Sequence, residues 1–502
     1  MTVWRRVASG IGAGVVSGLV LLGAAGCATS DRAGAPRAAP AATPLTSEAV
    51  ARNIESFDVV WQTVRDKHWD PTLGGVDWEK ARAELRPKVE AARTQPEARA
   101  AMSELLLRLN QSHFGIIPSE LYASAPAELD TPGAEAASGA AASGASPAPS
   151  ADPGSSRSGS PGLWVRVLDH RPVVTRVLPG SPAAAAGVKP GWVLTRLKGM
   201  DAEKMVRDAE SAESFTGSPL FHRAQAAMMM QSLLAGAPGS TVKTTFLDGS
   251  DREVQVELGR AELGTPANFS NLPTLMLVMD SRMLPGDVYY FGFSIFFDPP
   301  RLMDAVGKAV NAARQARDGQ GARGMIIDLR GNPGGIGALA MGIGGYLTEQ
   351  PNQKLGTMKT RTSNLNFVLN PRVDRFNGPV AVLVDELSMS TAEILAGGLK
   401  DLGRARVFGT PTPGAALPSI IAKLPNGDRF QYAMANYISV GGEPLEGKGV
   451  VPDEEVLLSR ASLMSGGITG DPAIDAALRW VNSQRTANNE PVADVAWSHA
   501  RP

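Results

Sequence analysis

Between Ser47 and Pro118, large apolar residues recur three and four positions apart. The pattern runs through "VARNIESFDVVWQTVRDKHW", "DWEKARAELRPKVEAARTQ" and "PEARAAMSELLLRLNQSHFGIIP". This spacing gathers apolar side chains on one face of a helix. We therefore expect a small helical domain over residues 47–123.

Two later regions follow other patterns. Residues 161–260 begin with strand-like "GLWVRV" and "VVTRV" and end in two alternating strands around an Asp-Gly turn, which predicts a small β domain. In residues 261–485, apolar strands such as "GMIIDL" and "VAVLVD" alternate with helical segments. Such alternation predicts a layered, mostly parallel α/β domain, whose ligand sites lie where strand ends meet helix starts.

The remaining segments lack the residues that a core requires. Residues 124–160 carry almost no large apolar side chain, so they cannot bury enough surface to fold, and we expect a disordered linker. Residues 28–46 are expected to form a Pro/Ala tether, and residues 486–502 a C-terminal tail.

Residues 1–27 have the pattern of an export signal. Arg5 and Arg6 precede an apolar stretch that ends in "AAGC" at Cys27. This pattern is typical of a bacterial lipoprotein, so we expect a lipid on Cys27 and anchoring to a membrane of the cell envelope, on its periplasmic or extracellular face. An uncleaved signal anchor is the alternative, because about 16 to 18 apolar residues are borderline for a membrane span.

Composition narrows the classes of function. A chain of 502 residues, 43% hydrophobic and 20% charged, has room for two or three globular domains. Its net charge of -1 provides no general attraction to nucleic acid. Cys27 is the only cysteine, which excludes an internal disulfide and a thiolate metal cluster. Histidine pairs at helical spacing, EF-hand loops and Walker loops are missing from the sequence, so we expect no metal and no cofactor.

Two strand ends carry residues suited to acyl transfer. In "MIIDLRGNPGG", Gly334 and Gly335 follow a buried strand and could offer N–H groups as an oxyanion hole, although a tight turn explains them equally well. In "VLVDELSMSTAEI", Ser390 stands between strand and helix, and the N–H of Thr391 would face an oxyanion beside it. Ser390 and Glu393 also have the spacing of a capping box, a role compatible with a nucleophile.

Three motifs occur in the order found in one peptidase family. "IDLRGNPGG", "DELSMSTAEILAGGLKDLG" and "YISVGGEPLEGKGVVPDEEV" resemble the catalytic domain of the carboxyl-terminal-processing (tail-specific) serine peptidases. The resemblance covers roughly residues 50–460. It implies a multidomain α+β protein with an N-terminal helical region, a PDZ-like β domain and an α/β peptidase domain of the ClpP/crotonase-like class.

The β domain carries its own resemblance. "VVTRVLPGSPAAAAGVKPGWVLTRLKG" resembles a PDZ domain. The resemblance implies that Gly162, Leu163 and Trp164 offer N–H groups to the C-terminal carboxylate of a polypeptide, which adds to the sheet as an edge strand. A small β domain with only a packing role is the alternative.

One position departs from the family pattern. The processing peptidases use a lysine 25 positions after the serine as general base, and Ala415 occupies that position here. No lysine lies between Lys400 and Lys423. The usual Ser/Lys mechanism is therefore not available, and another base is needed for a serine nucleophile.

The histidine that follows the third helical segment can fill this role. "LLLRLNQSHFGIIP" resembles the Ser-His motif of the tricorn-core branch of the same superfamily. Carried over residue by residue, the resemblance implies Ser390 as nucleophile, His113 as base, Ser112 as a link in a hydrogen-bond chain and Glu446 as its acidic end. An imidazole with a pKa near 6.5 can accept a proton from serine at neutral pH.

Other residues compete for these roles. His113 could instead be a cation stabilised at a helix C-terminus. Glu443 and Glu393 compete with Glu446. Of the other four histidines, His68 and His170 are expected to be structural or to face solvent; His222 and His499 complete the set.

The expected function is an exported, lipid-anchored serine endopeptidase that cleaves envelope polypeptides with the help of its PDZ-like domain. Two alternatives belong to other classes. One is a non-catalytic binding protein with the peptidase fold, because loss of the lysine is also what decay of an active site would produce. The other is a PDZ adaptor in the envelope, for which Ser390 would not matter.

Overall fold

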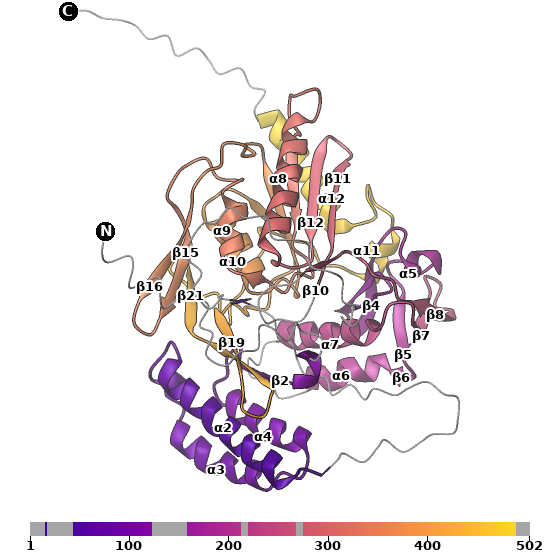
Figure 1. The fold of residues 1–502 in the computed structure, drawn as a ribbon. Coiled ribbons are helices and arrows are strands. Elements are labelled where there is room, and N and C mark those ends of the chain that lie inside the picture. The colour runs from indigo at the N-terminus through magenta and orange to yellow at the C-terminus, as the bar shows by residue number, and fades with distance from the viewer. Residues whose placement is uncertain (1–15, 18–43, 123–157, 212–218, 268–274, 488–502) are drawn as a thin grey trace, which may run out of the picture.

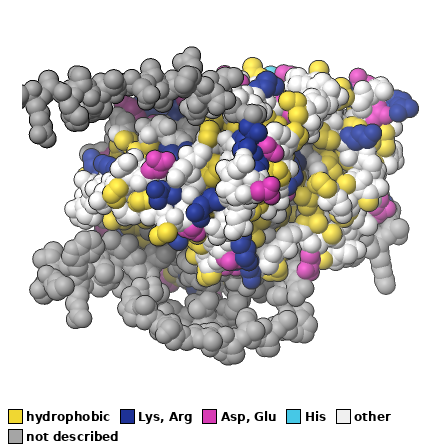
Figure 2. Space-filling view, turned by 90° about the horizontal axis from the view of Figure 1, so that it is seen from above, with side chains coloured by type: hydrophobic (Ala, Val, Ile, Leu, Met, Phe, Trp, Pro, Cys, Tyr) yellow, Lys and Arg dark blue, Asp and Glu magenta, His cyan; other side chains and the backbone are white. Residues whose placement is uncertain are grey.

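The computed structural model describes residues 16–17, 44–122, 158–211, 219–267 and 275–487 (Figure 1). The predictions of a signal ending at Cys27, a tether, a linker and a C-terminal tail fall almost wholly outside the described residues. Over the part of the chain that is described, no helix has both the length and the apolar character needed to cross a bilayer. On the face in Figure 2, cationic and anionic side chains are interspersed among apolar ones.

The predicted N-terminal helices are present and form a helical domain (residues 44–122). They are α2 (Ser47–Lys67), α3 (Trp78–Glu90) and α4 (Gln95–Leu107), with short 3-10 turns η1 (Leu73–Gly75) and η2 (Ser119–Tyr122). Each helix begins after a residue whose side chain accepts an N–H of the first turn: Thr46, Asp77 or Thr94. Trp61 and Trp78 each donate an indole N–H to the other's carbonyl at 3.0 Å, which fixes α2 against α3.

A strand that follows these helices belongs to a sheet of the C-terminal half. β2 (Gly115–Ile117) pairs antiparallel with β20 (Arg429–Ala433), which pairs in turn with β19 (Ser419–Lys423). The apolar core of the helices continues onto Phe430 and Tyr432 of β20. The segment between α4 and β2, which holds Ser112 and His113, is thereby held against the C-terminal half of the chain.

The middle domain (residues 158–262) is built around one antiparallel sheet. Its strands, in spatial order, are β3 (Leu163–Leu168), β4 (Arg171–Val177), β5 (Val193–Leu197), β7 (Thr241–Leu247) and β8 (Glu253–Gly259), with β6 (Met200–Asp201) paired to β5. The predicted Asp-Gly hairpin is therefore confirmed as β7 and β8. Its helices are α5 (Pro182–Ala185), α6 (Ala202–Ser211) and α7 (Pro219–Leu234); α7 lies alongside α6 on the side of the C-terminal half (Figure 1).

The α/β domain (residues 275–487) contains the predicted parallel sheet. Its order is β11 (Met279–Leu284), β12 (Val288–Phe293), β13 (Gly324–Asp328), β17 (Val380–Val384), β18 (Arg406–Gly409) and β22 (Glu454–Glu455), and all neighbours except β11 and β12 run parallel. Helices α8 (Pro299–Gln315), α9 (Ala338–Gly344) and α10 (Thr391–Asp401) pack on one face, and α12 (Pro472–Ala487) on the other. Both faces are buried, which explains the continuous apolar strands of the sequence.

Smaller elements surround this sheet. They are β15 (Gln353–Thr360), β16 (Asn364–Leu369) and β21 (Ala435–Ser439) in one antiparallel sheet, the pair β9 (Thr265–Ala267) and β10 (Leu275–Leu277), the pair β1 (Val16–Ser17) and β14 (Gly335–Ile336), and helix α11 (Arg460–Met464). Leu463 of α11 packs with Val173 and Val193 of the middle domain. The mixed α+β class expected from the sequence is confirmed, and the middle domain packs directly against the α/β domain.

Candidate active site

Ser390 lies in the turn between β17 and α10, which we call the serine turn (residues 385–390). Its backbone has φ 57° and ψ -115°, a strained region for a residue with a side chain and one suited to a nucleophile between strand and helix. Glu393 Oε2 accepts the Ser390 N–H at 2.8 Å, as in a capping box. Among the described residues the buried Ser390 Oγ has no hydrogen-bond partner, although it faces the N–H of Glu393 as in a capping box. Such a contact would use the oxygen only as an acceptor, so the hydroxyl proton is available to another group.

The predicted oxyanion-hole residues surround Ser390. A Cβ on Gly334 would lie 2.8 Å from the Ser390 Cβ and 2.9 Å from the Thr391 nitrogen, so the glycine turn (residues 331–335) touches the serine turn where only glycine fits. The Gly334 N–H already donates to Asn332 Oδ1 at 2.9 Å. Thr391 Oγ1 donates to the Gly335 carbonyl at 2.9 Å and joins the two turns. The N–H groups of Thr391 and of Gly335, a residue that also pairs with Ser17 of β1, therefore remain as the candidate oxyanion donors.

Ser112, His113 and Glu446 form one hydrogen-bonded chain. Ser112 Oγ lies 2.6 Å from His113 Nδ1 and 2.7 Å from Glu446 Oε2. Glu446 also accepts the N–H of Ser112 at 2.7 Å and that of Ala416 at 3.0 Å. Its competitor Glu443 is exposed and pairs with Lys448. The structure thus brings together three of the four residues assigned to catalysis.

The direction of this chain follows from the charge of Glu446. Burial raises the pKa of Glu446 to about 7. When the carboxylate is ionised it can only accept, so the Ser112 hydroxyl donates to Glu446 and accepts the N–H of His113 Nδ1. His113 Nε2 then carries no proton, and it is buried without a hydrogen-bond partner in the part of the chain that the structure describes. Burial lowers the pKa of His113 to about 3, which keeps the ring neutral.

Ala415, which stands at the position of the family lysine, lies between Ser390 and the hydrogen-bonded chain of His113. Glu393 Oε2 accepts the Ala415 N–H at 3.0 Å as well as that of Ser390. The next amide, that of Ala416, donates to Glu446. Burial raises the pKa of Glu393 to about 7, and the charge of Glu446 adds to this increase. Backbone amides thus connect two buried carboxylates, one beside Ser390 and the other at the end of the His113 chain.

Helix α7 of the middle domain covers the serine turn. One buried apolar cluster contains residues of α7, the serine turn and the lysine position: Phe221, Ala224, Ala227, Leu387, Met389 and Ala415. Ser390 is 0% exposed beneath it. In this arrangement a polypeptide cannot reach the Ser390 hydroxyl.

The residues assigned to peptide binding lie at the start of the edge strand β3. Gln231 of α7 donates to the Leu163 carbonyl at 2.7 Å and accepts the Val165 N–H at 3.5 Å. The Gly162 N–H donates to Ser160 Oγ at 3.1 Å. Gln231 of α7 therefore occupies backbone groups of Leu163 and Val165 that an added peptide strand would use, and Ser160 occupies the N–H of Gly162.

The other histidines that the structure describes have different hydrogen-bond partners. His68 is buried, with its ring nitrogens 2.9 Å from the Asp70 carbonyl and from Gln111 Oε1, which is a structural role. The His170 side chain is 70% exposed and pairs with Glu210. His222 lies 3.3 Å from the Glu210 carbonyl. His499 lies outside the described ranges.

Sequence reasoning missed the acidic residue that begins the serine turn. Asp385 Oδ1 accepts the N–H of Gly331 at 2.8 Å and that of Leu387 at 3.0 Å, so one carboxylate joins the glycine turn to the serine turn. The available signal was an acidic residue at the end of a buried parallel strand, where site residues gather.

Comparisons with known proteins support the motifs. Residues 300–456 match Peptidase family S41, and residues 51–106 match the Tricorn protease C1 domain. A "Probable CtpA-like serine protease" from Staphylococcus haemolyticus is 23% identical over 297 residues, which are 59% of this chain and 52% of that relative. A protein of the same description from Staphylococcus epidermidis is 30% identical over 27% of this chain and 28% of its own length. The chain thus spans about half the length of the first relative and less of the second.

Solved structures show the same fold. Mature CPAF is similar with a TM-score of 0.55 at 13% identity, over 89% of this chain and 100% of that one. The photosystem II D1 C-terminal processing protease is similar with a TM-score of 0.51 at 18% identity, over 84% of this chain and 95% of that one. The resemblance expected from the three motifs is confirmed: residues 300–456 match Peptidase family S41, and the preceding residues 51–106 match the Tricorn protease C1 domain.

Proposed function

We propose that this protein is a serine endopeptidase in which His113 replaces the family lysine as general base for Ser390. One observation carries the proposal. Within the described ranges, Ser390 Oγ and His113 Nε2 are both buried polar atoms without a partner, in residues connected by one hydrogen-bond network. An unpaired buried polar group costs about 1–3 kcal/mol, and these two are distinguished from other unpaired atoms by the network that they share.

The chemistry follows from the direction of the hydrogen-bond chain. Ser390 Oγ attacks the carbonyl carbon of a peptide bond while its proton moves to His113 Nε2. The N–H groups of Gly335 and Thr391 stabilise the oxyanion. The leaving amine takes the proton from Nε2, which leaves an acyl-enzyme that water hydrolyses with the same base.

Ser112 and Glu446 have a supporting role in this scheme. Ionised Glu446 acts through the Ser112 hydroxyl to keep the proton on His113 Nδ1 and to stabilise the imidazolium that forms during the reaction. The pKa of about 3 belongs to the covered ring, because burial is its cause. Entry of substrate or water beside the ring would return the pKa toward its ordinary value near 6.5.

The middle domain would act as a PDZ-like receptor for the substrate. A polypeptide's C-terminal end would add along β3 near Gly162, Leu163 and Trp164 once Gln231 releases the Leu163 carbonyl. A small shift of α7 along the core of the middle domain would free both the Leu163 carbonyl and the serine turn, because Gln231 and Phe221 lie on the same helix. The substrates would be exported or envelope polypeptides, with the protein held at a membrane through Cys27; this part of the proposal is supported by the sequence of residues 1–27 alone.

A fluorophosphonate probe and a casein or tail-peptide assay test the reaction in the full chain. Wild type should be labelled and should cleave the polypeptide, and Ser390→Ala should do neither. His113→Ala should lower both rates by about 10²- to 10⁴-fold, the usual contribution of a general base. Equal labelling of His113→Ala and wild type would remove the base assignment.

The complete burial of Ser390 beneath α7 favours a second candidate, a non-catalytic binding protein with the peptidase fold. The same assay separates the two functions. A wild-type protein that binds a tail peptide but neither cleaves it nor reacts with the probe would be a receptor.

A further inference from the structure

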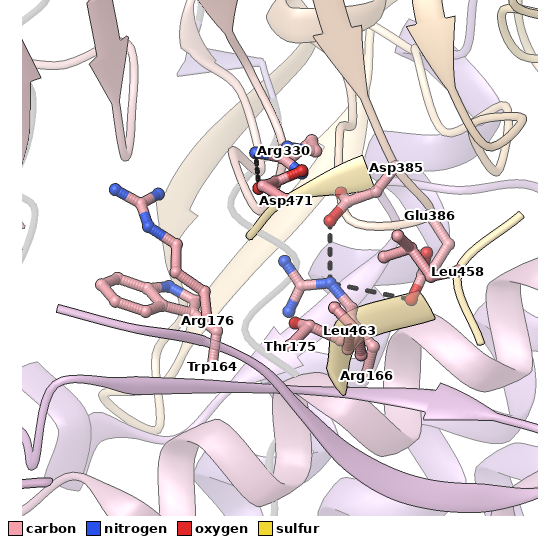
Figure 3. A pocket seen from close by; sticks show the side chains of 10 residues that line it. All are labelled: Trp164, Arg166, Thr175, Arg176, Arg330, Asp385, Glu386, Leu458, Leu463 and Asp471. Carbon is pink, nitrogen blue, oxygen red and sulfur yellow. Dashed lines mark hydrogen bonds and ion pairs between the residues drawn. The ribbon is translucent and has the colours of Figure 1, made fainter. Parts of the chain in front are cut away.

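The contact between the middle domain and the serine turn contains a buried ion pair that the proposed reaction does not use. Arg166 of β3 is only 4% exposed. Its Nε donates to Asp385 Oδ2 at 2.8 Å and lies 3.7 Å from Glu386 Oε1. Its Nη1 donates to the Val165 carbonyl at 3.0 Å, which fixes the guanidinium on its own strand. Figure 3 shows the Arg166 guanidinium directed at the two carboxylates.

Asp385 is where the two turns of the candidate site are joined. While Oδ2 receives Arg166, Oδ1 receives the Gly331 N–H at the start of the glycine turn and the Leu387 N–H inside the serine turn. Close to the nucleophile, the Met389 N–H donates to the Asn332 carbonyl at 3.0 Å. The orientation of the Asp385 carboxylate therefore affects where Gly335 lies relative to Ser390.

Arg166 also contacts the glycine turn directly. A Cβ on Gly331 would lie 2.7 Å from Arg166 Nη2, and Gly331 has φ 73°, so only glycine allows this approach. Asp385 and Glu386 are adjacent and buried; burial and the charge of Asp385 raise the pKa of Glu386 to about 7, so removal of the arginine would above all leave the Asp385 carboxylate without its cation. The guanidinium thus neutralises the start of the serine turn and supports the glycine turn at once.

We propose that Arg166 is a positioning residue for the peptidase reaction, which holds Asp385 so that the oxyanion donors and Ser390 Oγ keep their relative positions. The inference rests on the proposed function of Ser390. It gives the middle domain two separate contacts with the site: α7 covers the serine, and β3 aligns it. Any movement that uncovers Ser390 must then leave the β3 contact in place.

Substitutions in the full chain test the role of Arg166. Arg166→Met keeps the stem and removes the guanidinium, and Arg166→Lys keeps only the charge. The matched control is Arg176→Met. Arg166 and Arg176 both line the pocket drawn in Figure 3, but the Arg176 guanidinium stacks 4.7 Å from the Trp164 ring centre, away from Asp385. Arg166→Met should lower kcat for a tail peptide by about 10²-fold, as expected for a small misalignment of a site. KM should stay within about threefold of wild type, Arg166→Lys should recover part of kcat, and Arg176→Met should stay within about twofold.

A double variant separates alignment from a general loss of structure. If Arg166 acts through Asp385, Arg166→Met combined with Asp385→Asn loses no more kcat than Asp385→Asn alone. Additive losses, an unchanged kcat in Arg166→Met, or an effect on KM alone would overturn the inference.

Hydrogen exchange provides a readout that does not depend on catalysis. Peptides that contain the Gly331 and Leu387 amides should exchange at least several-fold faster in Arg166→Met and at the wild-type rate in Arg176→Met. Unchanged exchange in Arg166→Met overturns the inference even if wild type proves inactive. Wild type that fails to react with the fluorophosphonate, together with the expected exchange result, contradicts the proposed function and leaves the alignment by Arg166 standing.

Discussion

The two sides of the candidate site differ in how their buried groups are satisfied. On the base side, Glu446 accepts three hydrogen bonds and His113 Nδ1 is paired with Ser112, so polar groups hold the ring in one orientation. On the nucleophile side, α7 places Phe221 and two alanines over the serine turn, and Ser390 Oγ has no hydrogen-bond partner among the residues that the structure describes. A polar network fixes direction, whereas apolar contacts are non-directional and separate more easily. In the proposed mechanism the imidazole of His113 would therefore be oriented in advance, and access to the Ser390 hydroxyl is the part that would have to change.

The largest expected effect comes from reversing the direction of the base chain. In Glu446→Gln, the side-chain NH₂ can donate to Ser112 Oγ, and the Ser112 hydroxyl then donates to His113 Nδ1. The proton of the ring moves to Nε2, which can no longer accept one from Ser390. We expect kcat to fall by about 10³- to 10⁴-fold, as when the acidic member of a serine triad is amidated.

The matched control for this substitution is Glu443→Gln, three residues away in the same loop. Glu443 is exposed and pairs only with Lys448 among the contacts that the structure describes, so its substitution should change kcat by less than about twofold. If both variants lose activity alike, the chain from Glu446 to His113 has no directional role.

The neutral state of buried His113 should appear in the pH dependence of stability. The folded pKa of about 3 lies below the unfolded value near 6.5, so the unfolded chain binds a proton between these values that the folded protein does not. As far as His113 is concerned, the free energy of unfolding has its full value above about pH 6.5 and decreases as the pH falls toward 3. Glu393 and Glu446 act in the opposite direction, because their folded pKa values of about 7 favour the folded state as the pH falls below 7.

Comparison with a histidine variant isolates the contribution of His113. Between pH 7 and pH 5, the free energy of unfolding of His113→Asn should fall by about 2 kcal/mol less than that of wild type, and the carboxylate contributions should largely cancel. Urea unfolding at the two pH values measures this difference. Equal pH dependence in both proteins would mean that the imidazole is solvated, and it would contradict the burial of the His113 ring.

The sequence allowed good predictions where local pattern determines structure. Helical spacing located α2 to α4, continuous apolar runs located β13 and β17, and the strand-to-helix turn placed Ser390. The family resemblance singled out Ser112, His113 and Glu446, which the fold brings into contact across more than three hundred residues. Sequence spacing alone could not distinguish Glu446 from Glu443. The two lie three residues apart in one loop, and only the folded structure shows which carboxylate is buried.

The contacts made by the middle domain could not be predicted in the same way. Arg166 is the single charged residue in the strand "LWVRVL", and its partner is 219 positions away, beyond the reach of any local pattern. Helix α7 offered a weak signal, since "PLFHRAQAAMMMQSLL" has apolar residues on more than one face. Such a helix is buried on two sides. Ala226, Met230 and Leu234 pack into the middle domain, and Phe221, Ala224 and Ala227 pack onto the serine turn.

The smallest effect we expect comes from weakening the contact between α7 and the serine turn. Phe221→Ala removes the largest apolar group over the serine turn, and truncation of a buried phenylalanine costs about 3–5 kcal/mol. Part of that cost falls on the contact that keeps α7 closed, and each 1.4 kcal/mol shifts the open fraction tenfold. Labelling of Ser390 by a small fluorophosphonate should therefore become about tenfold faster, although the variant has lost folding stability. Leu233→Ala, on the same helix but packed against the core of the middle domain, lowers stability without loosening the serine turn and should leave the labelling rate within about twofold. Faster labelling in both variants would show that general unfolding, and not release of the apolar cover, exposes the nucleophile.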